Sequence, residues 1–357
     1  MKNWLMSLQI GLVFVGSIVG AGLSSGRELT QFFAVYGYRS FFGLLISAIL
    51  YVIVGKMIIF LSIKYDIKSY SDFINLVCPR PIAIFTNIVL TLFLLSSTSI
   101  ILAGSGAVVH QYFGVPKIFG ICIMIVVSIL FLLRKTQGIF EVNNITVPIL
   151  IVMMLAIIIG YSTKNTEHMS LSYIVSLPYT KNNFIISSLV YAGFNIISIV
   201  GIIVPLSSEI KSNKVILHGV IIGTIILTVI STIIVFLMIV NPTYAKTYDI
   251  PILAVAKNIA PILQICLLVM IWLEMFSSQI SNIFGLTKTF ESKFGLKYEH
   301  GIIVSILIAL PLSSVGFTNL VDVLYPIYGV LSLAFVACVI RFYIRQKISY
   351  TGVYMEK

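Results

Sequence analysis

The chain is divided into ten long apolar runs separated by short polar or charged segments. They fall near residues 8–36, 41–63, 82–109, 116–133, 139–160, 184–207, 215–240, 259–286, 301–316 and 318–343. About 20 consecutive apolar residues let an α-helix cross the hydrocarbon core of a bilayer. Because lipid offers the backbone no hydrogen-bond partners, such runs fold as helices. The sequence therefore predicts an all-α polytopic membrane protein with ten transmembrane helices.

The composition excludes a soluble globule, and the placement of charge excludes a nucleic-acid partner. Apolar residues make up 59% of the chain and charged residues 10%, whereas soluble domains carry about 25% charged residues. The net charge of +11 lies mainly between the apolar runs: fifteen Lys and Arg residues lie on the side of the N-terminus and six on the other. This asymmetry predicts a multi-pass protein of a bacterial cell membrane with both termini cytoplasmic. The lipid bilayer is the expected partner of the basic segments.

Motifs typical of enzymes lack their structural setting. Residues 22–26, Gly-Leu-Ser-Ser-Gly, match the pattern G-x-S-x-G, but that motif needs a strand, a turn and His and acid partners. The sequence contains neither a phosphate-binding loop nor a paired-histidine metal motif. We therefore expect a protein that is not an enzyme, with no catalytic residues and no cofactor, apart from a sodium ion considered below.

No linker divides the chain, which predicts one integral domain over residues 1–357. Two segments between runs are expected to form short amphipathic helices. One covers 69–77 on the cytoplasmic side, and the other covers 250–259 on the outer side, where Pro251 suits a helix start.

The first apolar run has an unusual number of glycines for a membrane helix. It contains Gly16, Gly20, Gly22 and Gly26, followed by the charged pair at 27–28. A glycine costs about 1 kcal/mol relative to alanine inside a helix, so the cluster needs an explanation. One explanation is close helix packing through small-xxx-small pairs. The other is a break in mid-membrane around Gly20 to Gly22, whose freed N–H groups could bind a carboxylate.

A second interruption, Gly193-Phe194-Asn195, lies near the centre of the run at 184–207. Interrupted segments at corresponding places in two halves indicate the binding site of an inverted-repeat transporter. Here the halves would span about 5–160 and 183–345, with five helices each, so they would insert with opposite orientation. The pattern predicts that helices 1 and 6 are discontinuous.

Residues 14–33, Phe-Val-Gly-Ser-Ile-Val-Gly-Ala-Gly-Leu-Ser-Ser-Gly-Arg-Glu-Leu-Thr-Gln-Phe-Phe, resemble the N-terminal signature of the YkvI-type amino-acid permeases. These form a bacterial branch of the amino acid–polyamine–organocation (APC) superfamily. The resemblance implies the LeuT-like fold, with the substrate between unwound helices 1 and 6. By the logic of unsatisfied backbone groups, the N–H groups of Gly20, Ala21 and Gly22 are expected to bind a substrate carboxylate and the carbonyls around Tyr191, Gly193 and Phe194 its amine. Tyr191, Phe194 and Asn195 are expected to shape the side-chain pocket.

Polar residues in the run at 259–286 suggest how transport is coupled to an ion. Glu274 lies near the middle of the membrane, and Ser277 and Ser278 share its helix face. The family resemblance implies sodium beside such a hydroxyl pair, and the backbone carbonyls of Gly16 and Val19 could complete its shell. The Glu274 carboxyl could carry a proton instead, or it could only make an interhelical hydrogen bond. Sodium and proton coupling both stay open.

Arg27 and Asp322 lie at compatible depths toward the outer side. The resemblance implies an outer gate closed by this pair, with Arg27 displaced by one position, and a purely structural ion pair is the alternative. Glu28 projects about 100° away from Arg27 on a helix, so it is expected to face a different neighbour.

These features predict a secondary active transporter, a symporter of an amino acid or related small zwitterion driven by a sodium or proton gradient. The alternative is a transporter-like receptor that binds a small molecule without moving it, and only a measurement of flux separates the two. A channel is disfavoured because the sequence has no repeated filter. The expected partners are a small-molecule substrate and lipid, and the oligomeric state is unknown.

Overall fold

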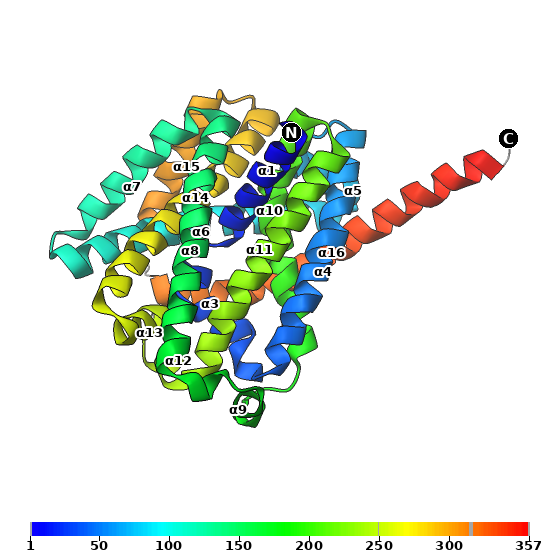
Figure 1. Ribbon diagram of the computed structural model, residues 1–357. Coiled ribbons are helices and arrows are strands. Elements are labelled where there is room, and N and C mark those ends of the chain that lie inside the picture. The colour runs from blue at the N-terminus through cyan, green and yellow to red at the C-terminus, as the bar shows by residue number, and fades with distance from the viewer. Residues whose placement is uncertain (1, 249, 314–316, 356–357) are drawn as a thin grey trace.

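The computed structural model describes residues 2–248, 250–313 and 317–355. Side chains are described in these ranges except at 2, 21, 107, 111–112, 245–246, 317–325 and 348–355. The described part of the chain is a bundle of helices (Figure 1). Seven of them are long and apolar enough to cross a bilayer: α4 (Arg39–Lys64), α6 (Arg80–Phe113), α8 (Lys135–Lys164), α10 (Phe184–Ile210), α11 (Asn213–Val240), α14 (Pro261–Phe294) and α16 (Phe317–Met355).

Three shorter apolar helices, α1 (Lys2–Ile18), α7 (Lys117–Leu132) and α15 (Tyr298–Leu312), account for the remaining predicted runs. Both predicted short helices form, as α5 (Tyr70–Val77) and α13 (Pro251–Ile259). The sequence did not predict four further short segments, which are η1 (Ala34–Tyr36), η2 (Thr166–Met169), α9 (Leu171–Ser176) and α12 (Pro242–Thr247). The prediction of an all-α polytopic membrane protein is confirmed.

Helix α10 forms the centre of the bundle and packs against α4 and α16. In its most apolar stretch 89% of the residues are buried, compared with 33% for α8. Figure 1 shows α1 lying beside α10 and α11. The helices that carry the predicted site are therefore in the interior, while helices such as α8 expose apolar side chains suited to lipid.

The backbones of α1 and α11 touch at glycines. A Cβ atom added to Gly11 would lie 3.0 Å from the carbonyl oxygen of Gly219, and one added to Gly223 would lie 2.7 Å from the carbonyl oxygen of Gly11. Van der Waals contact between closely approaching backbones drives helix association in lipid. These three glycines, which we call the glycine seam, hold α1 against α11.

The first membrane span is broken, as the sequence predicted. Helix α1 ends at Ile18, and the chain resumes as α2 (Ala21–Ser24) and α3 (Arg27–Phe32). At the break the N–H of Gly20 donates to the carbonyl of Ile18 (2.9 Å) and leaves the helical pattern. Gly26 then joins α2 to α3 with φ of 82°, a left-handed conformation that favours glycine.

The predicted discontinuity of the sixth span is wrong, because α10 runs without interruption from Phe184 to Ile210. Gly193 is needed for packing: its Cβ would lie 2.6 Å from Ser332 Oγ on α16. Asn195 lies within the helix, and its side-chain amide donates to the Tyr191 carbonyl (3.2 Å) one turn earlier. The interruption read from the sequence is a close helix contact rather than a break.

The glycine seam predicts that Gly223→Val destabilises the bundle. The branched side chain would enter the space occupied by the α1 backbone, and overpacking of this kind costs about 1–3 kcal/mol. We expect a lower midpoint of thermal unfolding for the purified protein, measured by size-exclusion chromatography after heating. Gly201→Ala is the control, since its Cβ would be 3.7 Å from the nearest atom. Equal midpoints for the two variants would contradict this assignment.

Candidate functional site

The break in the first span faces two hydroxyl groups of α14. Ser278 Oγ lies 3.1 Å from the carbonyl oxygen of Gly16 and 2.9 Å from that of Val19. Ser277 Oγ lies 3.4 Å from the Gly16 carbonyl. The structure therefore brings together all four residues that the sequence analysis named as a sodium site.

Asn143 of α8 completes this group, which we call the oxygen cluster. Its Nδ2 donates to the carbonyl of Ile139 (2.8 Å), so its Oδ1 is free to accept from Ser277 Oγ (2.7 Å). The side chain is fully buried. Sequence reasoning missed Asn143: an amide in an apolar run was the available signal, but the sequence does not show which helix it faces.

The oxygen cluster has the ligands that a hard cation prefers. It contains two backbone carbonyls (Gly16 and Val19), two hydroxyls (Ser277 and Ser278) and one amide oxygen (Asn143), all without charge. Sodium-like ions are held by such oxygens, and rotation of the hydroxyl hydrogens would turn oxygen lone pairs toward the ion. The residues present therefore fit a monovalent cation.

Glu274 lies one helical turn from Ser277 and Ser278, toward the predicted outer end. It is fully buried, and neither of its carboxyl oxygens has a hydrogen-bond partner. The interhelical hydrogen bond considered from the sequence is therefore not made. An isolated carboxylate away from water is unfavourable by several kcal/mol, so this group needs a proton or a cation.

A small cavity adjoins the break. Its polar and aromatic lining comes from four spans: Ser17, Gly20, Glu28, Phe93, Ser97, Phe194, Asn195, Ser198, Ser278 and Asn282. It measures about 20 Å³, which is room for little more than one water molecule. A substrate would have to displace the surrounding helices or side chains to enter.

The predicted substrate residues do not all lie on the cavity wall. Gly20, Phe194 and Asn195 line the cavity. Tyr191 is buried behind it, 4.9 Å from the ring of Phe33, and Gly193 faces α16 instead. Ala21 and Gly22 open α2 beside the cavity, with Gly22 buried.

Of the predicted gate, Arg27 is half-buried at the start of α3, and the side chain of Asp322 lies outside the described residues. Glu28, for which the sequence predicts a neighbour other than Arg27, lies beside Tyr191. It approaches the hydroxyl of Tyr191, but neither its Oε1 nor that hydroxyl completes a hydrogen bond. The sequence analysis gave Glu28 no role in the site, although the structure places it on the cavity wall.

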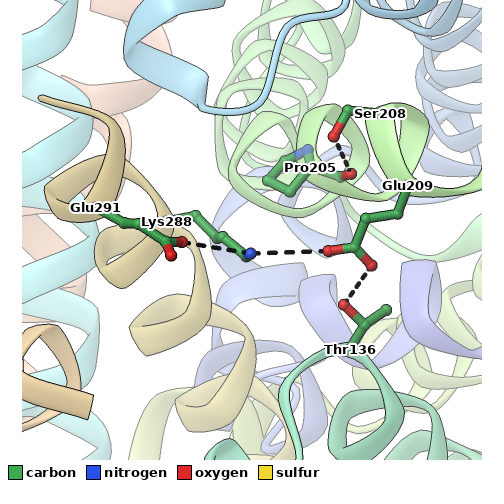
Figure 2. Close-up of polar contacts among 6 residues, drawn as sticks. All are labelled: Thr136, Pro205, Ser208, Glu209, Lys288 and Glu291. Atoms are coloured by element: carbon green, nitrogen blue, oxygen red, sulfur yellow. Dashed lines mark hydrogen bonds and ion pairs between the residues drawn. The ribbon is translucent and has the colours of Figure 1, made fainter. Parts of the chain in front are cut away.

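A polar network links three helices at the predicted cytoplasmic end (Figure 2). Lys288 Nζ of α14 lies 3.8 Å from Glu209 of α10 and 3.4 Å from Glu291 of α14. The other oxygen of Glu209 accepts a hydrogen bond from Thr136 Oγ1 of α8 (2.6 Å). This network joins α8, α10 and α14, which carry part of the cavity wall and part of the oxygen cluster.

Two proteins of Bacillus subtilis (strain 168) are similar over nearly the whole chain. The uncharacterized membrane protein YkvI is 29% identical over 332 residues, which is 93% of this chain and 94% of YkvI. The uncharacterized protein YyaD is 23% identical over 355 residues, which is 96% of this chain and 99% of YyaD. No protein-family profile matches the chain.

Solved transporter structures share the fold. MhsT in complex with L-phenylalanine has a TM-score of 0.67 at 16% identity, covering 92% of this chain and 88% of MhsT. A Na⁺-coupled sialic acid symporter has a TM-score of 0.64 at 12% identity, covering 91% and 74% of the two chains. Mhp1, a nucleobase-cation-symport-1 family transporter, has a TM-score of 0.60 at 14% identity, covering 89% and 74%. The chain has the LeuT fold of these transporters and is similar in sequence to YkvI.

The oxygen cluster predicts that Gly16→Ala disrupts the contact between α1 and α14. The added Cβ would overlap Asn143 Oδ1 and lie 2.5 Å from Ser277 Oγ. We expect a loss of about 1–3 kcal/mol in stability, measured as a lower thermal midpoint. Combining it with Asn143→Ala should recover part of the loss. Gly20→Ala is the control, because its Cβ would be 3.5 Å from Ser278 Oγ, and an equal loss there would contradict the prediction.

The network at the predicted cytoplasmic end predicts a small, salt-dependent effect for Lys288→Met. The side chains of Lys288, Glu209 and Glu291 are 20%, 39% and 46% exposed, and ion pairs of this exposure contribute about 0–1 kcal/mol. We expect a lower thermal midpoint at low ionic strength and little difference in 1 M salt, where the Debye length is about 3 Å. Lys293→Met, exposed on the same helix, is the control. A salt-independent loss would refute an electrostatic role.

Proposed function

We propose that this protein is a secondary active transporter, a symporter that carries an amino acid or a related small zwitterion across the cell membrane. The observation that carries the proposal is the mid-membrane break in the first span, with its carbonyls facing the Ser277 and Ser278 hydroxyls beside a central cavity. Irregular backbone at membrane depth is tolerated only where protein or a water-filled cavity satisfies it. Transporters use such breaks to bind substrate and ion.

The substrate carboxylate would bind at the start of α2. The first intrahelical hydrogen bond there runs from the N–H of Ser24 to the carbonyl of Gly20 (3.0 Å). The N–H groups of residues 21–23 precede that bond and have no carbonyl within α2 to pair with. Gly20 also lines the cavity, which supports a carboxylate site at this end of the break.

Sodium is the ion that the oxygen cluster fits, with Gly16, Val19, Ser277, Ser278 and Asn143 as its ligands. A bound ion would join α1 to α14 and would thereby couple the state of the broken span to the sodium gradient. Glu274 offers the other route, in which a proton moves with the substrate. The two routes predict different dependence on the two gradients and on two separate side chains.

The similar solved structures support a role in transport. The substrate class is inferred from the candidate site and from the sequence resemblance. Proteins with this fold include one solved with L-phenylalanine, a sialic acid symporter and a nucleobase-cation-symport-1 transporter. The amino-acid class is favoured by the resemblance of residues 14–33 to the YkvI-type branch of the APC superfamily. The asymmetry of basic residues supports cytoplasmic termini.

Uptake by purified protein in liposomes tests the proposal. A panel of labelled amino acids is offered under a sodium gradient alone and under a proton gradient alone. We expect concentrative uptake driven by sodium. Binding without flux into the vesicle would favour the receptor alternative, and neither binding nor uptake across the panel would overturn the proposal.

Two variants identify the coupling ion. Ser278→Ala removes one ligand of the oxygen cluster, so the sodium concentration for half-maximal uptake should rise about tenfold, equivalent to about 1.4 kcal/mol. Ser281→Ala is the control, since its hydroxyl lies 3.3 Å from Ser17 Oγ and outside the cluster. Uptake driven by protons and abolished by Glu274→Gln, with Ser278→Ala unaffected, would replace sodium by the proton as the coupling ion.

A further inference from the structure

Glu28 is an acidic side chain buried at the wall of the central cavity. It belongs to α3, is 3% exposed, and lines the cavity together with Gly20 and Asn195. Its Oε1 has no hydrogen-bond partner. Among the described residues that line this cavity, Glu28 is the one with an ionisable side chain. The cavity therefore has an acidic group without a basic one to balance it.

The polar neighbours of Glu28 do not neutralise it. The Asn195 amide has two hydrogens, and both are used, one on the hydroxyl of Tyr51 (3.0 Å) and one on the carbonyl of Tyr191 (3.2 Å). The hydroxyls of Tyr51 and Tyr191 lie near the carboxyl, but a phenol is neutral and can offer only one hydrogen bond. By the argument given for Glu274, the Glu28 carboxyl holds a proton while no cation is beside it, and a substrate ammonium group would supply the balancing charge.

The continuity of α10 means that its backbone offers no free carbonyls to a substrate amine. If the sixth span were broken, its free carbonyls around Tyr191 to Phe194 could accept hydrogen bonds from a substrate amine. In the structure these residues lie inside a regular helix, whose carbonyls are used by N–H groups one turn later. The amine of a zwitterion must therefore find another acceptor, and the carboxyl of Glu28 is on the wall of the same cavity.

The aromatic lining favours an organic ammonium group over a metal ion. Phe93 and Phe194 both line the cavity, with ring centroids 5.2 Å apart in an edge-to-face arrangement. Aromatic faces attract ammonium groups, whereas a hard metal ion needs several oxygens around it. The oxygen cluster supplies such oxygens next to the cavity, so a metal ion has a better site there.

We propose that Glu28 binds the protonated amino group of the substrate and so selects amine-bearing substrates. This inference rests on the proposed function and deepens it. Glu28, at the start of α3 and on the cavity wall, would hold the ammonium end of the substrate. Acids without an amino group would bring a second acidic group, and no positive charge, to the buried carboxyl of Glu28. Such acids would therefore bind much more weakly than amino acids.

Binding measurements on the full-length protein test this inference. Isothermal titration in saturating sodium uses the panel of amino acids, each paired with its N-acetyl derivative and with the acid that lacks the amino group. Both derivatives keep the carboxylate and remove the positive charge. We expect the amino acid to bind about 100-fold more tightly than either derivative, the size of effect seen when one member of a buried charge pair is removed.

Glu28→Gln should weaken binding of the amino acid by about 100-fold and abolish the preference over the derivatives. Glu28→Asp keeps the charge on a shorter side chain and should keep the preference with lower affinity. Glu167→Gln, at an exposed acid of η2, is the matched control and should bind like the unaltered protein. The thermal midpoint of each variant shows whether it folds, and Glu28→Asp decides the result if Glu28→Gln does not fold.

The outcomes separate this inference from the proposed function. If the unaltered protein binds amino acids but binds the N-acetyl derivatives equally well, transport stands and the role of Glu28 is refuted. The same conclusion follows if Glu28→Gln keeps the preference for the amine, or if it changes only the proton dependence of uptake. If no compound of the panel binds or is taken up, the proposed function fails and this inference fails with it.

Discussion

The centre of the molecule depends on how a broken helix satisfies its peptide groups inside a membrane. Where α1 ends, the carbonyls of Gly16 and Val19 would be left without partners in a medium that offers none. The Ser278 hydroxyl reaches both, at 3.1 and 2.9 Å. A side-chain hydroxyl thus replaces backbone N–H groups as the hydrogen-bond partner at the break. The central cavity and the oxygen cluster lie beside it.

The two glycine-containing interruptions looked alike in the sequence but fold differently, and the reason is the neighbouring helix. A Cβ on Gly20 would meet only Ser278, at an ordinary 3.5 Å, so that glycine is not needed for packing. A Cβ on Gly193 would meet Ser332 at 2.6 Å, so Gly193 serves a close contact with α16. That partner lies far along the chain, and a local pattern does not contain it. Hydropathy predicted the helices because their lengths depend on the bilayer alone.

In the candidate site, too, some residues could be predicted from the sequence and others could not. Ser277 and Ser278 could be placed with Gly16 and Val19 because the family resemblance fixed which helices face each other. Asn143 and Glu28 had no such guide, since whether a polar side chain points inward depends on the rotation of its helix. Their burial and their unusual partners identify them only once the bundle is assembled.

The glycine seam has a mechanical consequence. Because Gly11, Gly219 and Gly223 bring two backbones into direct contact, α1 and α11 cannot shift along each other without overlap of their peptide groups. In the proposed transport cycle the two helices would therefore move together. Val19 and Gly20, which belong to neither α1 nor α2, would be the place where they move relative to the rest of the first span.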